Sequence, residues 1–205
     1  MKLSEILNVI ERTAQYNKLS KPYIVGGLVR DKYLGDINKI NDIDITTGSE
    51  DILDLAQLVA KNLDTVLQVM PDGHSKIQFT NIKIDFSSAF KIPQIDRILK
   101  KGGIKNPTEM KKELYSRDFT CNTLLMTLDL SKILDPTGLA LEDINNNVIK
   151  TCLAPSITLS YDPKRIVRAI YLSAKLDFEI DNKVKEWIVN HTSIAEEIPG
   201  KYFKK

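Results

Sequence analysis

The sequence YIVGGLVRDKYLG, residues 23–35, carries the strongest structural signal in the chain. Its apolar start predicts a strand, Gly26 and Gly27 predict a tight turn, and the residues that follow predict a helix. Backbone N–H groups at such a helix start, together with the helix dipole, favour an anion such as a triphosphate, and Arg30 would add a charge-assisted donor. A plain strand-to-helix turn also explains a lone glycine pair, so the neighbouring segments must decide between the two interpretations.

Two aspartates follow in the segment NDIDI, residues 41–45. Strand alternation places Asp42 and Asp44 on one face, and Ile43 and Ile45 on the other face, toward the core. Two carboxylates this close repel each other unless a cation lies between them, and hard oxygen ligands suit magnesium, with manganese as the alternative. Two such ions can stabilise the attacking and leaving oxygens of a phosphoryl displacement. An acidic strand edge that faces solvent is the alternative for a DxD segment taken alone.

A third acidic residue, Asp85, lies in the segment IKIDF, residues 82–86, and faces away from the apolar residues of that segment. If this strand neighbours the one with Asp42 and Asp44, the three carboxylates form a catalytic triad. Asp85 would then hold a second metal ion or accept the proton of an attacking hydroxyl.

The composition is that of an ordinary globular protein of 205 residues, with 42% hydrophobic and 27% charged residues, which excludes fibrous and disordered classes. The formal net charge of +2 means that binding to nucleic acid would depend on clustered cations. The two cysteines, Cys121 and Cys152, form no zinc-binding pattern and fit a reduced cytosol. Because no run approaches the ~18 apolar residues of a membrane span, we expect a cytoplasmic protein that neither spans a membrane nor is exported.

Hydrophobic periodicity predicts an α+β protein, with a mixed sheet backed by helices in its first part. One helix would begin near residue 4, with Ser4 as its N-cap, and another would cover residues 51–63. The expected strands cover residues 23–25, 43–46, 65–69, 77–80 and 82–86, with the last three joined as a meander through turns at 71–73 and 80–81.

Helical patterns dominate the second part of the chain. We expect a mobile loop at residues 91–106, then a strand pair formed by 133–134 and 148–151. The expected helices cover residues 108–115, 118–127, 162–176 and 183–191, and a separate helical domain would begin near residue 156.

Four motifs occur along the chain in the same order as in one enzyme family. They resemble motifs of the class II tRNA nucleotidyltransferases (CCA-adding enzymes) and of the bacterial poly(A) polymerases. The GGLVRDKYLG and DID segments are similar to the start of the family's head domain. Three others resemble the family patterns RRDFTINA, DPFGG with a later DL, and EDPxRxxRA: SRDFTCNT at 116–123, DPTG at 135–138 with ED at 142–143, and YDPKRIVRA at 161–169. The resemblance covers nearly the whole chain. The chain departs from these patterns at Ser116, Leu139, Tyr161 and Tyr171.

The resemblance implies a nucleotidyltransferase fold of the polymerase-beta-like type. Residues 1–155 would form the head, or palm, domain, and residues 156–205 would form a small all-helical neck domain. The neck would be truncated or unusually compact, because members of the family continue into helical body and tail regions.

The resemblance also implies an enzyme that adds CMP and AMP to tRNA 3′ ends without a nucleic-acid template, from CTP and ATP, by two-metal phosphoryl transfer. The implied contacts are Gly27, Arg30 and Arg117 with the triphosphate, Asp42 and Asp44 with the metal ions, and Asp162, Arg165 and Arg168 with the incoming nucleotide.

Spacing within the last motifs supports some of these contacts independently. Asp162 and Arg165 are three residues apart, so on one helix they would share a face. The Asp162 carboxylate would then offer acceptors, and the Arg165 guanidinium donors, to the edge of a base. Alternatively, Asp162 before Pro163 is an N-cap of the helix. Asp118 and Asn122 are four residues apart and would share a helix face, from which Asn122 would reach a ribose hydroxyl.

The sequence is also compatible with other functions. The enzyme could add a poly(A) tail, only C or only A, and its acceptor could be another RNA 3′ end. A catalytically weak module that binds nucleotide or RNA is the alternative outside enzymes. The retained carboxylate cluster favours an enzyme, because a binding module has no need of such mutually repelling groups.

Overall fold

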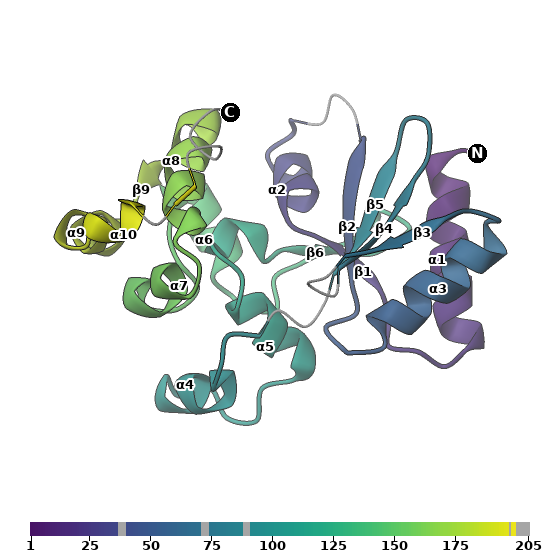
Figure 1. Cartoon of the computed structure of the whole chain (residues 1–205), viewed down its shortest axis with the longest axis horizontal. Helices are drawn as coiled ribbons and strands as arrows, with labels where there is room; N and C mark the ends of the chain where they lie inside the picture. Colours follow the sequence, from purple (N-terminus) through teal and green to yellow (C-terminus); the bar gives the residue numbers. More distant parts are fainter. Residues whose placement is uncertain (37–39, 71–73, 88–90, 197, 200–205) are drawn as a thin grey trace.

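The computed structural model describes residues 1–36, 40–70, 74–87, 91–196 and 198–199. Within these residues a mixed seven-stranded sheet has the strand order β3-β4-β5-β2-β1-β6-β7 (Figure 1). The turn that the sequence predicts at 71–73 lies outside the described residues. The strands are Tyr23–Val25 (β1), Asp42–Thr46 (β2), Leu67–Val69 (β3), Ser75–Gln78 (β4), Lys83–Phe86 (β5), Leu125–Met126 (β6) and Ile133–Leu134 (β7).

Strands β2 and β5 lie next to each other and run parallel, whereas the other pairings in the sheet are antiparallel. Their register pairs Ile43 with Ile84 and Asp44 with Asp85. Both isoleucines are fully buried, so the opposite face of each strand carries the acidic residues. The two acidic strands are therefore neighbours, which is the condition on which the expected triad of carboxylates depended.

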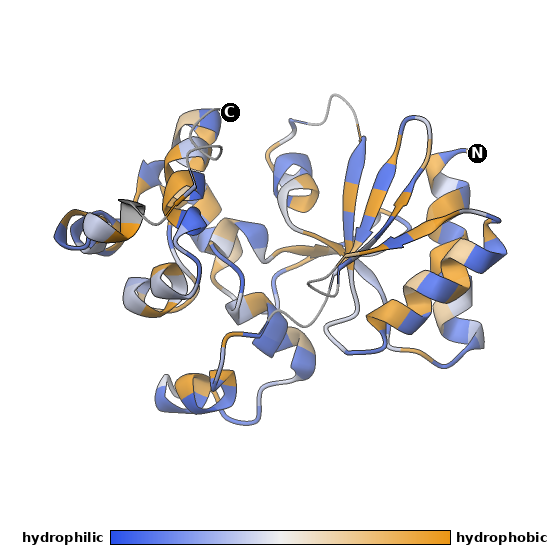
Figure 2. Ribbon diagram, viewed as in Figure 1, coloured by the Kyte–Doolittle hydropathy of each residue, from blue (hydrophilic) through white to orange (hydrophobic). Residues whose placement is uncertain are grey.

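Helices α1 (Leu3–Tyr16) and α3 (Ile52–Asn62) pack against each other, and α3 lies on strands β3, β4 and β5 (Figure 1). Apolar residues are concentrated on the strands and on the helix faces turned toward them (Figure 2). Ser4 is not the N-cap of α1. Lys2 takes that position, and its backbone N–H donates to the Glu5 carboxylate at 2.9 Å.

Three expectations for the middle of the chain are wrong. Residues 91–106 contain helix α4 (Ile95–Lys101), because Ile95 and Leu99 find a small apolar cluster in which to be buried. The expected helix at 118–127 is a short 3₁₀ turn (Thr120–Asn122) followed by β6, which pairs with β1. The expected strand pair does not form, because β7 pairs with β6 instead.

The 3₁₀ turn replaces a longer helix because its threonine hydroxyls bond to backbone groups. Thr123 Oγ1 donates to the Thr120 carbonyl at 2.8 Å, and Thr120 Oγ1 donates to the Lys150 carbonyl at 3.3 Å. Such local bonds compete with a continuing helix. Pairing of β6 with β1 then buries Met126 in the main core.

Helices follow the sheet, together with a second, two-stranded parallel sheet formed by β8 and β9. Their bounds are Glu109–Tyr115 (α5), Ala140–Asn145 (α6), Val148–Ile149 (β8), Pro155–Tyr161 (α7), Lys164–Leu176 (α8), Glu179–Ile180 (β9), Asn182–Asn190 (α9) and Ser193–Glu196 (α10). The β8–β9 pairing crosses the expected boundary near residue 155, and that division stays a prediction. None of the described helices is long and apolar enough to cross a membrane.

We expect Ile43→Ala to lower the free energy of unfolding by about 2–5 kcal/mol, because Ile43 is fully buried and its truncation leaves a cavity under the acidic face of β2. Urea denaturation measures this loss. Val189→Ala is the control, since Val189 is 71% exposed and should cost less than about 0.5 kcal/mol. Equal losses in the two variants would contradict this account of the core.

Candidate functional site

The turn from β1 into helix α2 (Gly27–Tyr33) brings the backbone of Gly26 against two charged side chains. Gly26 has φ 85°, a conformation that favours glycine. A Cβ at this position would lie 3.2 Å from Asp44 Oδ2 and 3.6 Å from Arg117 Nη1. The glycine therefore permits both the turn and the approach of Asp44 and Arg117 to the same stretch of backbone.

The two aspartates of β2 share one face, as expected, but their surroundings differ. The Asp42 side chain is 67% exposed, whereas Asp44 is only partly accessible. Burial raises the pKa of the Asp44 carboxyl above its ordinary value; the Arg117 guanidinium opposes the rise, and the Asp42 and Asp85 carboxylates add to it. An additional cation beside Asp44 would relieve this accumulation of negative charge.

Asp85 stands in register with Asp44, but its carboxylate forms an ion pair with Lys83. The Lys83 ammonium also lies 3.3 Å from Asp42 Oδ1. Lys83 was not among the residues expected at the site, although its place two residues before Asp85 puts both on one strand face. Burial alone would lower the pKa of Lys83, but its contacts with Asp85 and Asp42 raise it above the ordinary value.

The donor set fits a divalent cation that is shared with a substrate. Among the described residues, no group of three or more Asp, Glu, His or Cys side chains is placed to hold a metal ion. Asp42 and Asp44 therefore offer two hard oxygen donors, and a cation such as magnesium would take its other ligands from phosphate oxygens and water. The expected metal role of Asp85 stays a prediction.

Arg117 enters the site from the end of helix α5. Its Nε and Nη2 atoms donate to Glu113 Oε1 at 2.9 and 2.7 Å, which fixes the direction of the guanidinium. Burial alone would lower the pKa of Arg117, but the Glu113 and Asp44 carboxylates raise it. The side chain is thus held, positively charged, beside Asp44, where the sequence predicts a triphosphate contact.

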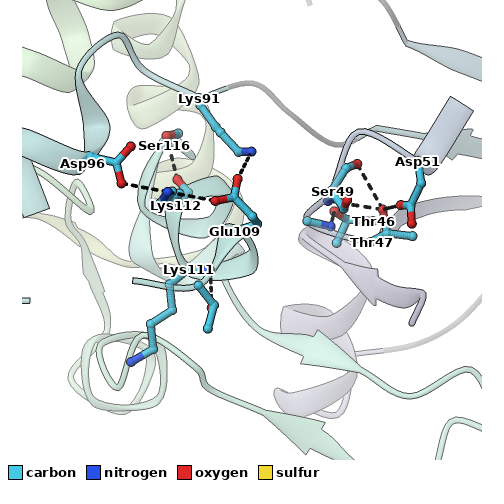
Figure 3. Close-up of polar contacts among 12 residues, drawn as sticks. Thr46, Thr47, Ser49, Asp51, Lys91, Asp96, Glu109, Lys111, Lys112 and Ser116 are labelled. Carbon is cyan, nitrogen blue, oxygen red and sulfur yellow. Dashed lines mark hydrogen bonds and ion pairs between the residues drawn. The ribbon is translucent and has the colours of Figure 1, made fainter. Parts of the chain in front are cut away.

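Polar contacts hold α5 in place, as Figure 3 shows. Lys112 forms ion pairs with Asp96 at 2.7 Å and with Glu109 at 2.8 Å. Ser116 Oγ donates to the Lys112 carbonyl at 2.8 Å and accepts from the Ile92 N–H at 3.0 Å. Ser116 is fully buried, so at this departure from the family pattern the side chain forms hydrogen bonds inside the fold.

Helix α5 also lies directly against the turn that follows β2. Gly48 has φ 68°, and a Cβ there would lie 2.6 Å from Met110 Cα of the helix. The turn itself is fixed by hydroxyl groups: Thr46 Oγ1 accepts from the Gly48 N–H at 3.0 Å, and Thr47 Oγ1 donates to Asp51 Oδ1 at 3.0 Å (Figure 3). This contact between Gly48 and Met110 was not expected from the sequence, in which the glycine is the signal that a close approach leaves.

Arg30 and Asn122 are directed at other protein groups. Arg30 is 3% exposed, donates to both Asp31 and Asn122, and its Nη1 lies 2.6 Å from Asn122 Oδ1. Asn122 Nδ2 donates to Asp118 Oδ1 at 3.0 Å, and Asp118 Oδ2 lies 3.1 Å from Arg168 Nε. This relay, in which Arg30, Asn122 and Asp118 are buried and Arg168 is exposed, connects α2 to α8. In this structure Arg30 and Asn122 position other groups, and their expected contacts with triphosphate and ribose stay predictions.

Asp162 and Arg165 do not share a helix, which corrects the expected arrangement. Asp162 precedes α8, and its Oδ1 accepts from the Lys164 N–H at 3.1 Å, as in a helix cap. Arg165 donates to the backbone carbonyls of Ser116 at 3.0 Å and Arg117 at 3.4 Å. Burial lowers the pKa of Arg165. Both side chains nevertheless border the same cavity.

That cavity has a volume of about 560 Å³, which is of the size of a nucleotide site. It lies between the acidic face of the sheet and helices α7 and α8. Its walls include six residues that the sequence singled out: Asp44, Arg117, Asp118, Asp162, Arg165 and Arg168. They also include His74, Ser87, Glu113, Ser116, Tyr161 and Lys164. Gly26, Gly27, Arg30, Asp42, Asp85 and Asn122 are not among these wall residues.

Comparison with known proteins gives a consistent result. Residues 22–150 match the family model described as the poly A polymerase head domain. A CCA-adding enzyme of Geobacillus sp. (strain WCH70) is 28% identical over 94% of this chain and 45% of its own length. A CC-adding tRNA nucleotidyltransferase of Geobacter sulfurreducens is 32% identical over 87% of this chain and 37% of its own length.

A solved structure supports the fold. A tRNA nucleotidyltransferase in complex with a primer tRNA and an incoming ATP analogue matches 94% of this chain and 53% of its own, with a TM-score of 0.71 and 25% identity. The chain thus spans about half the length, or less, of the relatives that it matches.

We expect Asn122→Ala to lower the free energy of unfolding by about 2–4 kcal/mol, because Arg30 and Asp118 would each lose a buried partner. Urea denaturation measures the loss. Asn145→Ala is the matched control, since Asn145 accepts one exposed hydrogen bond from Tyr33. A stable Asn122 variant that binds ATP poorly would show instead that Asn122 faces the nucleotide, as its spacing suggested.

Proposed function

The chain belongs to the poly(A) polymerase head domain family, and from this premise we propose that it transfers AMP and CMP from ATP and CTP to the 3′ end of an RNA, with tRNA as the acceptor. The family is one of metal-dependent nucleotidyltransferases. The single observation that carries the proposal is the position of Asp44. Its carboxylate and the Arg117 guanidinium both approach the Gly26 backbone, and both side chains border a cavity of nucleotide size.

Asp42 and Asp44 would hold the divalent cation, for which magnesium is proposed and manganese is the alternative. When bound, the cation would offset the negative charge that develops on the phosphoryl oxygens. Asp85 is proposed as the third carboxylate of the site. The protein's own contribution is to hold these carboxylates on two neighbouring strands, β2 and β5, whose opposite faces are buried in the core.

The triphosphate is assigned to Arg117 and to the backbone of Gly26 and Gly27. Arg117 is fixed by Glu113, so its guanidinium is oriented before a nucleotide arrives. The glycine turn permits close approach of a phosphate to backbone N–H groups. These contacts do not depend on the base, and they would bind ATP and CTP alike.

The base is assigned to the opposite wall. Asp162, Arg165 and Arg168 border the cavity there, and they offer carboxylate acceptors and guanidinium donors. Arg168 is 63% exposed, whereas Arg165 is mostly engaged with backbone carbonyls. Asp162 and Arg168 are therefore the side chains best placed to read a base edge.

One assay tests the function directly. The chain is incubated with magnesium, each of the four NTPs separately, and tRNAs that end before the CCA sequence, after C or after CC. Addition of C, C and A in turn supports CCA addition, and arrest after CC or use of A alone identifies a partial enzyme. A long A tail would identify a poly(A) polymerase. ATP binding without extension of any tRNA or other RNA would favour the binding module and contradict the proposal.

We expect Asp44→Asn to lower turnover by at least ~10³, about 4 kcal/mol of transition-state stabilisation, while the chain stays folded. The fold should survive because burial makes the charged form of Asp44 unfavourable, and this effect raises its pKa in spite of the nearby Arg117 guanidinium. Turnover in the tRNA assay and the circular dichroism spectrum are the measurements. Asp54→Asn, which removes an exposed acid from α3, should keep full activity.

Asp162→Ala should change the choice among nucleotides by about 1–3 kcal/mol of discrimination, because one polar contact with the base is lost. The measurement is kcat/KM for CTP and ATP relative to UTP and GTP. Asp181→Ala is the matched control, because Asp181 caps α9 by accepting from the Lys183 N–H at 3.0 Å and does not border the cavity. The same uniform loss of rate in both variants would mean that Asp162 is only a helix cap.

A further inference from the structure

The acidic face of the β2–β5 pair carries a lysine among its three carboxylates. The register pairs Asp42 with Lys83 and Asp44 with Asp85, and residues two apart on a strand share a face. The Lys83 ammonium lies 3.3 Å from Asp42 Oδ1 and forms an ion pair with Asp85. One of the two aspartates assigned to the metal thus already has a cationic partner, supplied by the chain itself.

The two contacts of Lys83 differ in how firmly they hold. Asp42 is 67% exposed, and an exposed ion pair is weak and readily exchanged. Asp85 is 22% exposed and forms the more buried of the two contacts. A cation that binds Asp42 can therefore displace the ammonium from that carboxylate, while Asp85 keeps Lys83 nearby.

We propose that Lys83 is a tethered competitor of the divalent cation at Asp42, and that it remains on Asp85 when the cation binds. This inference rests on the proposed function, since it takes Asp42 and Asp44 as the metal ligands. Lys83 is a positioning residue: its ammonium pairs with Asp42 before a cation binds, and it opposes the binding of a cation that arrives alone. A cation that arrives with a triphosphate brings negative charge with it and meets less opposition.

Titration of the chain with Mn²⁺, followed by the electron paramagnetic resonance signal of free Mn²⁺, tests the proposal without turnover. Lys83→Met should bind Mn²⁺ about tenfold more tightly than the unmodified chain, because a positive charge close to the cation is removed. Lys83→Gln keeps a donor for Asp85 without the charge and should bind as tightly as Lys83→Met. Lys83→Arg keeps the charge and should retain the original affinity.

A second lysine provides the matched control. Lys76 on β4 stands in register with Asp85, yet within the described part of the chain it makes no ion pair. Lys76→Met removes the same charge from the neighbouring strand and should change the Mn²⁺ affinity by no more than about twofold. Thermal denaturation adds an independent readout, since Mn²⁺ should raise the Tm of Lys83→Met and Lys83→Gln more than that of the unmodified chain.

The outcomes separate this inference from the proposed function. Mn²⁺ binding that is lost in Asp44→Asn but is equally tight in Lys83→Met and the unmodified chain overturns the role of Lys83 and leaves the metal site standing. A similar gain in Mn²⁺ affinity in Lys76→Met and Lys83→Met also overturns the role of Lys83, because the gain would then come from the lower net charge of the chain and not from this position. Failure of the unmodified chain and both neutral Lys83 variants to bind Mn²⁺ overturns the metal site and this inference together.

Discussion

Burial of one side of β2 is the constraint on which the rest of the site depends. Ile43 and Ile45 are fully enclosed by the core, and because side chains alternate along a strand, Asp42 and Asp44 must point the other way. A slip of one residue would bring both carboxylates into the core, which is prohibitively unfavourable. Burial of the two isoleucines thus holds the Asp42 and Asp44 carboxylates close together in spite of their mutual repulsion.

Charged groups also join the two walls of the cavity. Asp118 is buried, and burial alone would raise its pKa, but Arg168 and the hydrogen bonds from Asn122 and Phe119 lower it below the ordinary value. The carboxylate connects Asn122, and through it Arg30 of α2, with Arg168 of α8. The same guanidinium that holds this connection borders the cavity. Structure and binding share these side chains, so a ligand would act on contacts that also support the fold.

The local part of this architecture was predictable from the sequence, and the long-range part was not. Strand alternation within residues 41–45 and 82–86 identified the carboxylate face correctly, because that pattern depends only on neighbours along the chain. The contact of Arg30 with Asn122 was not predictable in this way, since Asn122 is 92 residues away. The helix expected at 118–127 was wrong because the groups that replace it lie far away along the chain: Thr120 Oγ1 bonds to the Lys150 carbonyl, and β6 pairs with β1. Lys83 was overlooked because its significance appears only once β2 and β5 are placed together.

Arg165 joins α8 to the 116–117 segment through main-chain carbonyl oxygens, which every amino acid possesses. These hydrogen bonds therefore do not depend on which side chains residues 116 and 117 carry. The two bonds from Arg165 would be the same with the arginine of the family pattern at position 116 as with the serine found here. Residue 116 thus has two separate tasks: its carbonyl oxygen holds α8, and its hydroxyl bonds to Lys112 and Ile92 beside α5.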